Sequence, residues 1–258
     1  MQKPILIPSR AAAVGPGSGG DLPFPAVEIV SGASLTACAL PIIMRKRLLA
    51  ERKPMEFKQT VHKRFAARAY DTGYEISDQQ LEELFELAGL TPTTFNVQHT
   101  RYIVIRDKAR MKKLRELAKG QAHVEKCSAL IYILGKLDCY RDAPEIYQDV
   151  PQEICDILLP AIHEFYDGKE DVQYDEALRN ASLAAMTLML AATDMGLDTC
   201  AIIAMDIDKT AEYLGVPEGY ATAMMITLGK AHEEQPPRGH RWPVDKIVTR
   251  ESFDGNPL

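Results

Sequence analysis

The chain has 258 residues, of which 46% are apolar and 26% are charged, as in a soluble globular protein with one large domain or two small ones. Its formal net charge of −6 argues against a nucleic-acid partner, and no apolar run reaches the roughly 20 residues that span a membrane. Five cysteines without a CxxC pair fit reduced thiols in the cytoplasm, and no histidine pair has metal-ligand spacing. We therefore expect a cytoplasmic protein with no metal site.

Residues 1–54 differ in composition from the rest of the chain. Ala11–Leu22 is rich in Ala, Gly, Pro and Ser, which predicts a flexible segment. Ala33–Met44 is apolar, but its positive charges follow it, whereas a secretory signal has them in front. We expect a leader outside the fold, with the domain beginning near Met55; a targeting or anchoring arm is the alternative.

Between residues 77 and 134 the pattern predicts two helices and two strands. A capping box formed by Ser77 and Gln80 opens the first helix, which continues with apolar residues at helical spacing to Gly89. Residues 101–106 predict a strand, and 108–119 a charged amphipathic helix. The apolar run 129–134 predicts a buried strand.

The second half of the chain alternates in the same way. Residues 138–171 are irregular and helical, which we interpret as an inserted cap on the domain 55–258. Residues 174–196 are apolar nearly all round and predict a buried central helix. A short helix over 208–214 and a buried strand over 223–228 follow. This order of helices and few strands predicts an α+β or α/β sandwich.

Common phosphate-binding and hydrolase motifs are missing from the sequence. It contains no GxGxxG, no GxxxxGK[ST] and no GxSxG. A phosphate site must therefore use arginine and lysine side chains together with scattered backbone N–H groups. Arg64 and Arg68 lie four residues apart, so they would share a face if the segment were helical, although two such arginines are also common on a solvated surface. Arg241 could likewise belong to an exposed C-terminal arm.

Taken in order, four segments resemble the FMN-dependent nitroreductase-like flavoproteins. Arg64–Tyr70 is similar to the family's opening R-x-S-x-[RK]-x-[FY], and Pro92–Gln98 to its P-[ST]-[ST]-x-N-x-Q loop. Met195–Cys200, followed by Asp206, resembles the end of the family's long helix and the loop after it. The closing part is matched by Leu214–Tyr220, Leu228–Gly229 and Arg241–Pro243. The resemblance runs from about Met55 to Phe253 and implies a three-layer α/β/α sandwich that forms a homodimer with FMN at its interface.

The resemblance also implies a set of site residues. Arg64 and Arg241 would bind the FMN phosphate, and Arg68 would lie near the pyrimidine edge of the flavin, where a cation stabilises the reduced ring. Thr93, Thr94 and Asn96 would reach the flavin of the partner subunit. The full cofactor set implied is Arg64, Phe65, Ala66, Arg68, Thr93, Thr94, Asn96, Gln98, Gln121, Ile203, Ala204, Arg238 and Arg241.

Two departures from the family pattern lie at expected cofactor contacts. Ala66 replaces the usual serine of the opening motif and removes a hydroxyl contact. Ala204 stands where glycine would let the backbone approach the ring closely. Both departures bear on flavin tuning and on substrate range more than on the fold.

The function implied is an oxidoreductase that takes a hydride from NAD(P)H and passes it to an electron-poor acceptor, such as a nitroaromatic or a quinone, in the same slot. One site used twice predicts ping-pong kinetics, and no side chain is assigned a catalytic role. Phe165 and Tyr166 of the insert are candidates for the substrate pocket, with ordinary packing as the alternative. The alternative functions are an FMN-dependent dehydrogenase or dehalogenase and a flavin-binding protein without turnover.

Overall fold

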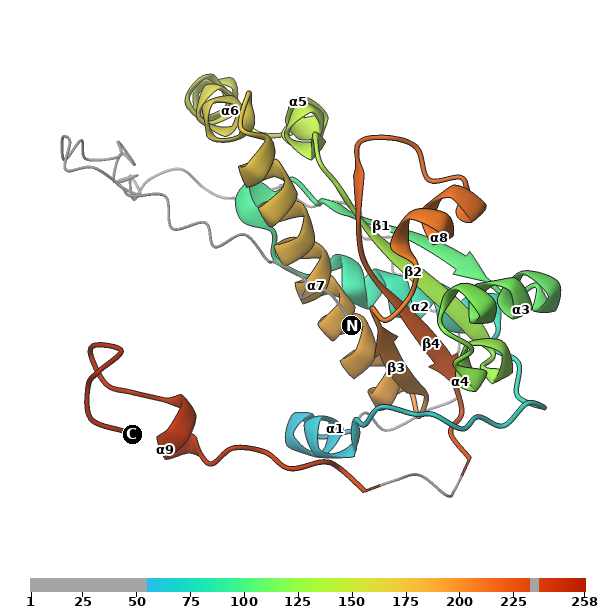
Figure 1. Cartoon of the computed structure of the whole chain (residues 1–258). Helices are drawn as coiled ribbons and strands as arrows, with labels where there is room; N and C mark the ends of the chain where they lie inside the picture. Colours follow the sequence, from blue (N-terminus) through green and yellow to red (C-terminus); the bar gives the residue numbers. More distant parts are fainter. Residues whose placement is uncertain (1–54, 233–236) are drawn as a thin grey trace, which may run out of the picture. The chain divides into compact units, whose positions relative to one another are not determined.

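An antiparallel sheet lies at the centre of the computed structural model, which describes residues 55–232 and 237–258. Its strands are β1 (Thr100–Ile105), β2 (Ala129–Lys136), β3 (Asp198–Ile202) and β4 (Tyr220–Gly229). Within the described residues the strand order is β1-β2-β4-β3, and every neighbouring pair is antiparallel (Figure 1). All described residues belong to the unit Arg52–Leu258, and the predicted leader, residues 1–54, lies outside them.

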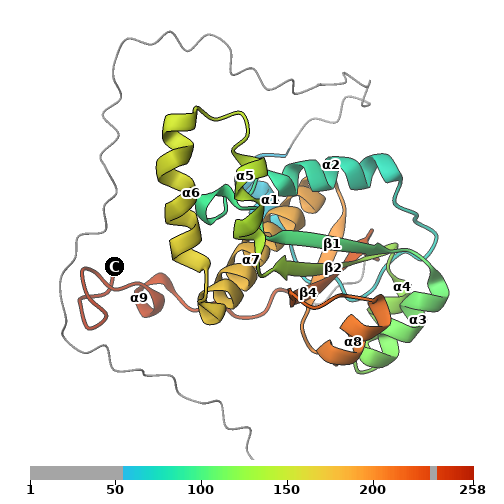
Figure 2. The same ribbon diagram turned by 90° about the horizontal axis from the view of Figure 1, so that it is seen from above.

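Helices cover both faces of the sheet and give the predicted three layers. One face carries α2 (Asp78–Gly89) and α7 (Glu170–Asp194), and the other carries α3 (Lys108–Leu117), α4 (Ala122–Lys126) and α8 (Ile207–Leu214) (Figure 2). Because successive side chains of a strand point to opposite faces, a strand covered on both sides is apolar throughout. This is why the run 129–134 has no polar alternation.

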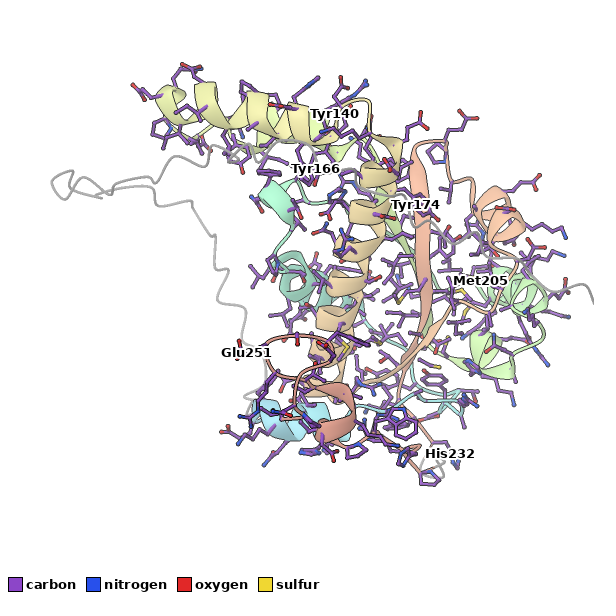
Figure 3. The ribbon with its side chains drawn as sticks, turned by 60° about the vertical axis from the view of Figure 1, so that its left-hand side comes forward. Tyr140, Tyr166, Tyr174, Met205, His232 and Glu251 are labelled. Atoms are coloured by element: carbon purple, nitrogen blue, oxygen red, sulfur yellow. The ribbon has the colours of Figure 1, made fainter. Side chains whose placement is uncertain are left out.

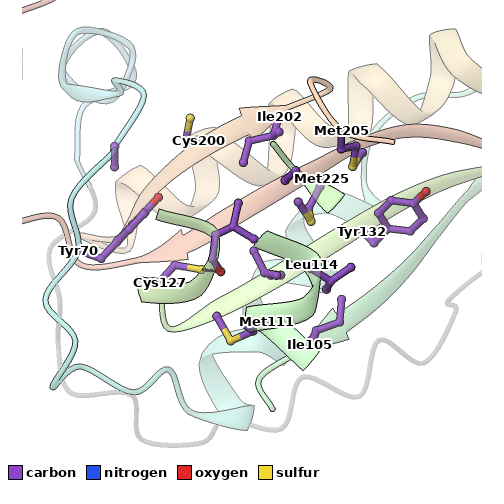
Figure 4. Close-up of a cluster of buried hydrophobic side chains, with 14 of the residues drawn as sticks. Tyr70, Ile105, Met111, Leu114, Cys127, Tyr132, Cys200, Ile202, Met205 and Met225 are labelled. Carbon is purple, nitrogen blue, oxygen red and sulfur yellow. Dashed lines mark hydrogen bonds between the residues drawn. The ribbon is translucent and has the colours of Figure 1, made fainter. Parts of the chain in front are cut away.

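Strand β2 divides its side chains between two cores. Leu130 and Tyr132 pack with α3 and α4 in the first core, which Figure 4 shows in close-up. Ile131 and Ile133 pack with α2 and α7 in the second core. All four side chains are fully buried. At Gly135 of the same strand, a Cβ atom would lie 2.5 Å from the carbonyl oxygen of Ala177, so glycine allows α7 to cross the sheet closely.

The long helix α7 is only partly covered within the single chain. Its sequence suggests burial on all sides, but only the face that contains Ala181, Ala185 and Leu188 is covered by the sheet and α2. Leu183 and Met186 point to solvent in the single chain, and Leu183 is 49% exposed. The helix therefore presents an apolar face that the rest of the described chain leaves uncovered.

Most predicted boundaries agree with the structure within a few residues. The capping box is formed, because the hydroxyl of Ser77 accepts a hydrogen bond from the N–H of Gln80 while the Gln80 side chain returns to the N–H of Ser77. The elements that were not predicted include α1 (Phe57–Lys63), the short helix α4, and strand β3 after Gly196. The C-terminal segment contains the short helix α9 (Val244–Ile247).

The segment between β2 and α7 is helical and forms a third core together with the loop before β1. It contains the 3-10 turn η2 (Cys139–Asp142), α5 (Ala143–Ile146) and α6 (Gln152–Tyr166). Tyr166 is fully buried there and stacks on Tyr140 with ring centroids 5.5 Å apart (Figure 3). Of the helices in the described ranges, none combines the length and apolar content that crossing a membrane requires.

Candidate functional site

The segment with the first two arginines is extended rather than helical. Helix α1 ends at Lys63, and Arg64 leaves it with φ −57° and ψ 126°. Ala66 then forms a parallel bridge with Thr199 of β3, and the N–H of Ala67 donates to the Thr199 carbonyl at 3.0 Å. In an extended chain, side chains two apart point to the same side. Arg64, Ala66 and Arg68 accordingly line the same cavity.

This arginine cavity joins two segments that are about 170 residues apart in sequence. Its volume is about 280 Å³. Its lining combines the extended segment with the start of the C-terminal segment, which passes α1 in Figure 1. The lining residues are Arg64, Phe65, Ala66, Arg68, Pro237, Arg238, Gly239 and Arg241.

Hydrogen bonds of Arg238 hold the two segments together. Its guanidinium donates to the carbonyl of His62 at 2.8 Å and also to the carbonyl of Arg64. Arg241 donates to the carbonyls of Gly239 and His240, at 3.1 and 2.9 Å, which shapes the turn of the C-terminal segment. Arg238 is therefore bound to the segment of Arg64 through two backbone carbonyls, and Arg241 lies close to both.

Three arginines of the cavity, Arg64, Arg238 and Arg241, lie close together without a carboxylate partner among the described residues. Partial burial lowers the pKa of the Arg64 guanidinium, and the nearby guanidinium groups of Arg238 and Arg241 lower it further. Within residues 55–232 and 237–258, no carboxylate pairs with any of these three arginines. An anion bound between them would relieve this repulsion, and guanidinium groups bind phosphate through two parallel hydrogen bonds. The residues present therefore fit the phosphate of FMN.

Next to the cavity, a second set of predicted residues lies together. The side-chain amide of Gln121 donates to the carbonyl of Ala204 at 3.1 Å and to that of Ala118 at 3.0 Å, which ties the start of α4 to the loop after β3. Ile203 and Ala204 are exposed in this loop. The structure thus brings Gln121 next to the loop with Ile203 and Ala204, about 80 residues later in the chain, and all three belong to the cofactor set that the family resemblance implies.

His123 of α4 is a neighbour of this set that sequence reasoning missed. Its Nε2 is buried, with no hydrogen-bond partner among the described residues. Burial lowers the pKa of this imidazole, and the charge of Arg68 lowers it further, so the ring is neutral at pH 7. No sequence signal marks His123, because a histidine in a short helix has no recognisable pattern.

The other predicted site residues lie on the loop before β1. This loop contains the 3-10 turn η1 (Thr94–Asn96), and Thr93 Oγ1 accepts a hydrogen bond from the N–H of Gln98 at 3.0 Å. Phe95, Asn96 and Gln98 have φ of 51°, 50° and 53°, in the left-handed region that non-glycine residues rarely adopt. Within the described ranges, the exposed side-chain amides of Asn96 and Gln98 make no hydrogen bond.

The predicted site residues therefore form two groups at opposite ends of α7. Thr94 is bonded to Asn180 in the first half of the helix, whereas Ala66 pairs with Thr199, beyond the helix end at Asp194. From Asn180 to Asp194 the helix advances about 21 Å, at about 1.5 Å per residue. A single chain therefore does not bring the loop and the arginine cavity together.

The two candidates for the substrate pocket differ in their surroundings. The Tyr166 side chain is fully buried, and its hydroxyl lies 3.3 Å from Nε2 of His99, so the tyrosine packs inside the insert. Phe165 is partly exposed and meets Phe95 of the loop edge to face, with ring centroids 5.4 Å apart. Only Phe165 of this pair reaches the surface of the chain beside the loop.

Apolar side chains are exposed on three helices that pack together. Helices α1 and α2 both contact α7. Leu90 at the end of α2 is 79% exposed, and exposed apolar side chains continue over all three helices. They are Phe57, Val61, Leu87, Leu90, Leu183 and Met186. An exposed apolar surface of this extent is typical of a protein interface.

Comparison with known proteins agrees with this arrangement. The sequence pattern of the Nitroreductase family matches residues 61–230. The chain is 36% identical over 201 residues to "Putative NAD(P)H nitroreductase MhqN" of Bacillus subtilis strain 168, and the aligned residues make up 75% of this chain and 98% of that protein. It is 27% identical over 197 residues to a Thermus thermophilus protein named NADH dehydrogenase, with 75% and 95% covered. A protein of Exiguobacterium sibiricum 255-15, solved in complex with FMN, is 30% identical and superposes with a TM-score of 0.72 over 76% of this chain and 98% of its own. The family match spans more than half of the chain and the identity to MhqN extends over nearly all of that protein, so this chain belongs to the nitroreductase family.

Proposed function

We propose that this protein is an NAD(P)H-dependent FMN oxidoreductase that works as a homodimer and reduces nitroaromatics, quinones or similar electron-poor acceptors. The observation that carries the proposal is the arginine cavity, where three guanidinium groups converge without a carboxylate partner among the described residues. Family membership supports FMN as the ligand, because a relative at 30% identity was solved with FMN bound. The names of two relatives, which contain NAD(P)H or NADH, support the electron donor.

The residues of the arginine cavity would bind and orient the cofactor. Arg64, Arg238 and Arg241 would hold the phosphate, and Arg68, on the same extended segment, would lie toward the ring, where its charge would stabilise the reduced state. Gln121 fixes the carbonyl of Ala204, so this loop keeps one conformation beside the ring. When bound, FMN supplies the hydride chemistry, and for that reason no side chain is assigned as acid or base.

A second copy of the chain would complete the site. The exposed apolar face on α1, α2 and α7 supplies the interface, and its side chains would be buried between the two copies. Dimerisation would place Thr93, Asn96 and Gln98 of one copy near the arginine cavity of the other. Phe165, beside the same loop, would then border the acceptor slot. The four described cysteines are free thiols, which supports a location in the cytoplasm.

A visible spectrum recorded during anaerobic titration tests this proposal. The purified protein should show flavin absorbance that bleaches on addition of NADH or NADPH and returns when a quinone or a nitroaromatic is added. Double-reciprocal plots at several donor concentrations should be parallel, because donor and acceptor use one slot in turn. Flavin that stays oxidised with both donors would refute the reductase activity and favour a flavin-binding protein without turnover. Absence of flavin after incubation with FMN would refute the cofactor assignment. Intersecting lines would refute the shared slot.

A further inference from the structure

Two polar side chains of α7 bind the site loop at a single residue. The hydroxyl of Thr94 donates to Oε2 of Glu176 at 2.5 Å, and the backbone N–H of Thr94 donates to Oδ1 of Asn180 at 3.2 Å. Because Glu176 and Asn180 are four residues apart, they lie on the same face of the helix. The backbone N–H of Thr94 is therefore directed toward α7, and its hydroxyl contacts both α7 and Tyr166 of the insert.

Glu176 and Asn180 occupy an environment that usually contains apolar side chains. Glu176 is 8% exposed and Asn180 is 2% exposed, on the helix that packs Ala177 and Ala181 against the rest of the domain. Burying a carboxylate and an amide is unfavourable unless both are hydrogen-bonded, and such buried polar sets add little net stability. An apolar pair of the same size would pack at least as well. Stability alone therefore does not account for these two residues.

The polar set is closed on itself apart from its contact with the loop. Asn180 Nδ2 donates to the Glu176 carbonyl at 2.7 Å and to Glu176 Oε2 at 3.1 Å. Arg179, whose side chain is 60% exposed, bonds to Glu176 Oε1 and brings the compensating charge from the surface. Thr94 thus links this set to the loop, because it donates one hydrogen bond to Glu176 and one to Asn180.

What the set holds is a strained conformation. Thr94 begins the turn η1, and Phe95, Asn96 and Gln98, which follow it, all have positive φ. Left-handed non-glycine residues persist only where the surrounding contacts determine the backbone, and they are concentrated at functional sites. From the insert, the hydroxyl of Tyr147 donates to the Phe95 carbonyl at 2.8 Å and fixes the turn on its other side. The side-chain amides of Asn96 and Gln98 are left exposed by this backbone.

We propose that Glu176 and Asn180 are positioning residues, which hold Thr94 so that the amides of Asn96 and Gln98 face the flavin of the partner subunit. Thr94 is then a tether of the loop and not itself a flavin ligand, in contrast to the role that the family resemblance implies. This inference rests on the proposed function, because it assumes that FMN binds beside the loop.

The test compares Thr94→Val with a matched control on the same helix. Thr94→Val removes the hydroxyl at nearly constant volume, and Thr94→Ser restores it. The control is Thr187→Val, which removes the hydrogen bond of 2.8 Å from Thr91 to α7 without touching η1. If the amides of Asn96 and Gln98 lose their hydrogen bonds to FMN, the FMN Kd of Thr94→Val should rise about ten- to hundredfold, and the visible circular dichroism of the flavin should change. Thr94→Ser and Thr187→Val should resemble the parent protein.

Double-mutant cycles separate positioning from general destabilisation. If Thr94 acts through Asn96, the Asn96→Ala change should raise the FMN Kd in the parent protein and have little further effect in Thr94→Val. The effect of Arg64→Ala should remain additive with Thr94→Val, because the phosphate lies at the other group of residues. Asn180→Leu should reproduce Thr94→Val, provided its melting curve shows a folded protein.

The outcomes distinguish this inference from the proposed function. A parent protein that binds no FMN would overturn both. A parent protein that binds FMN, together with a Thr94→Val variant that matches Thr187→Val in Kd and in circular dichroism, would overturn the positioning role alone. Additive effects of Thr94→Val and Asn96→Ala would also overturn it, because they would show that the tether does not act through the amide.

Discussion

Replacing Arg64 by alanine tests the assignment of the arginine cavity most directly. Its guanidinium is partly buried, lines the cavity, and lies close enough to Arg238 and Arg241 for their charges to lower its pKa. Hydrogen bonds to a charged group contribute about 1.5 to 3 kcal/mol each. At about 1.4 kcal/mol per factor of ten, the FMN Kd of Arg64→Ala should rise about 10- to 150-fold.

The same substitution should leave the apoprotein folded. Arg238 is bonded to the backbone carbonyl of Arg64, and alanine retains that carbonyl. Removing one of three mutually repelling cations takes away an unfavourable term in the free protein. We therefore expect the melting temperature of the apoprotein to change little, while the rise in melting temperature that FMN produces becomes smaller.

Fluorescence titrations with FMN and with riboflavin, which lacks the phosphate, provide the measurement. Arg64→Ala should weaken FMN binding and leave riboflavin binding nearly unchanged, so that the preference for FMN is largely lost. Arg110→Ala is the control, because that guanidinium lies 5.6 Å over the ring of Tyr213, away from the cavity. An FMN Kd equal to that of the parent protein, or an equal loss of affinity for both flavins, would refute the phosphate assignment.

Three further changes have defined outcomes. Gly135→Ala would place a Cβ atom 2.5 Å from the Ala177 carbonyl oxygen, so unfolding in urea should show a loss of about 1 to 3 kcal/mol, and an unchanged midpoint would contradict this packing. Leu183→Glu introduces a charge into the exposed face of α7 and should give a monomer in light scattering; a parent protein that is already monomeric would refute the shared site. Burial lowers the pKa of His99 below its usual 6.5, so as the pH falls the unfolded chain binds a proton at His99 before the folded protein does. Protonation then favours the unfolded state, and the free energy of unfolding should decrease as the pH drops below about 6.5. In His99→Gln, the free energy of unfolding should decrease less between pH 7.5 and 5.5 than in the parent protein. An identical decrease in both proteins would show that His99 does not cause the pH dependence.

Elements with strong local signals could be predicted from the sequence. The capping box at Ser77 and Gln80 depends on residues three apart, and the run 129–134 is apolar because both of its faces are buried. The family resemblance and the three-layer fold are confirmed by the match over residues 61–230 and by the sheet with helices on both faces. In these cases the information lies within a few neighbouring residues or in the order of motifs.

Features that depend on distant contacts could not be predicted. Strand β3 is short, and its residues pair with β4, more than 20 positions later in the chain, and through Thr199 with Ala66, far earlier in the chain. The extended form of Arg64–Arg68 likewise depends on the bridge between Ala66 and Thr199. The buried role of Glu176 was missed, because a carboxylate within a helix is usually a solvated residue.

The contacts of the insert change how its contribution to function should be understood. Tyr147 donates to the carbonyl of Phe95, and Phe165 packs against the ring of that same residue. Tyr166 reaches His99, immediately after the loop, from inside the insert. The insert and the loop are therefore one packed unit, held on its other side by Glu176 and Asn180 of α7. We therefore expect a substitution in the interior of the insert to act on the proposed acceptor slot by moving Asn96 and Gln98, and not only by reshaping a wall of that slot.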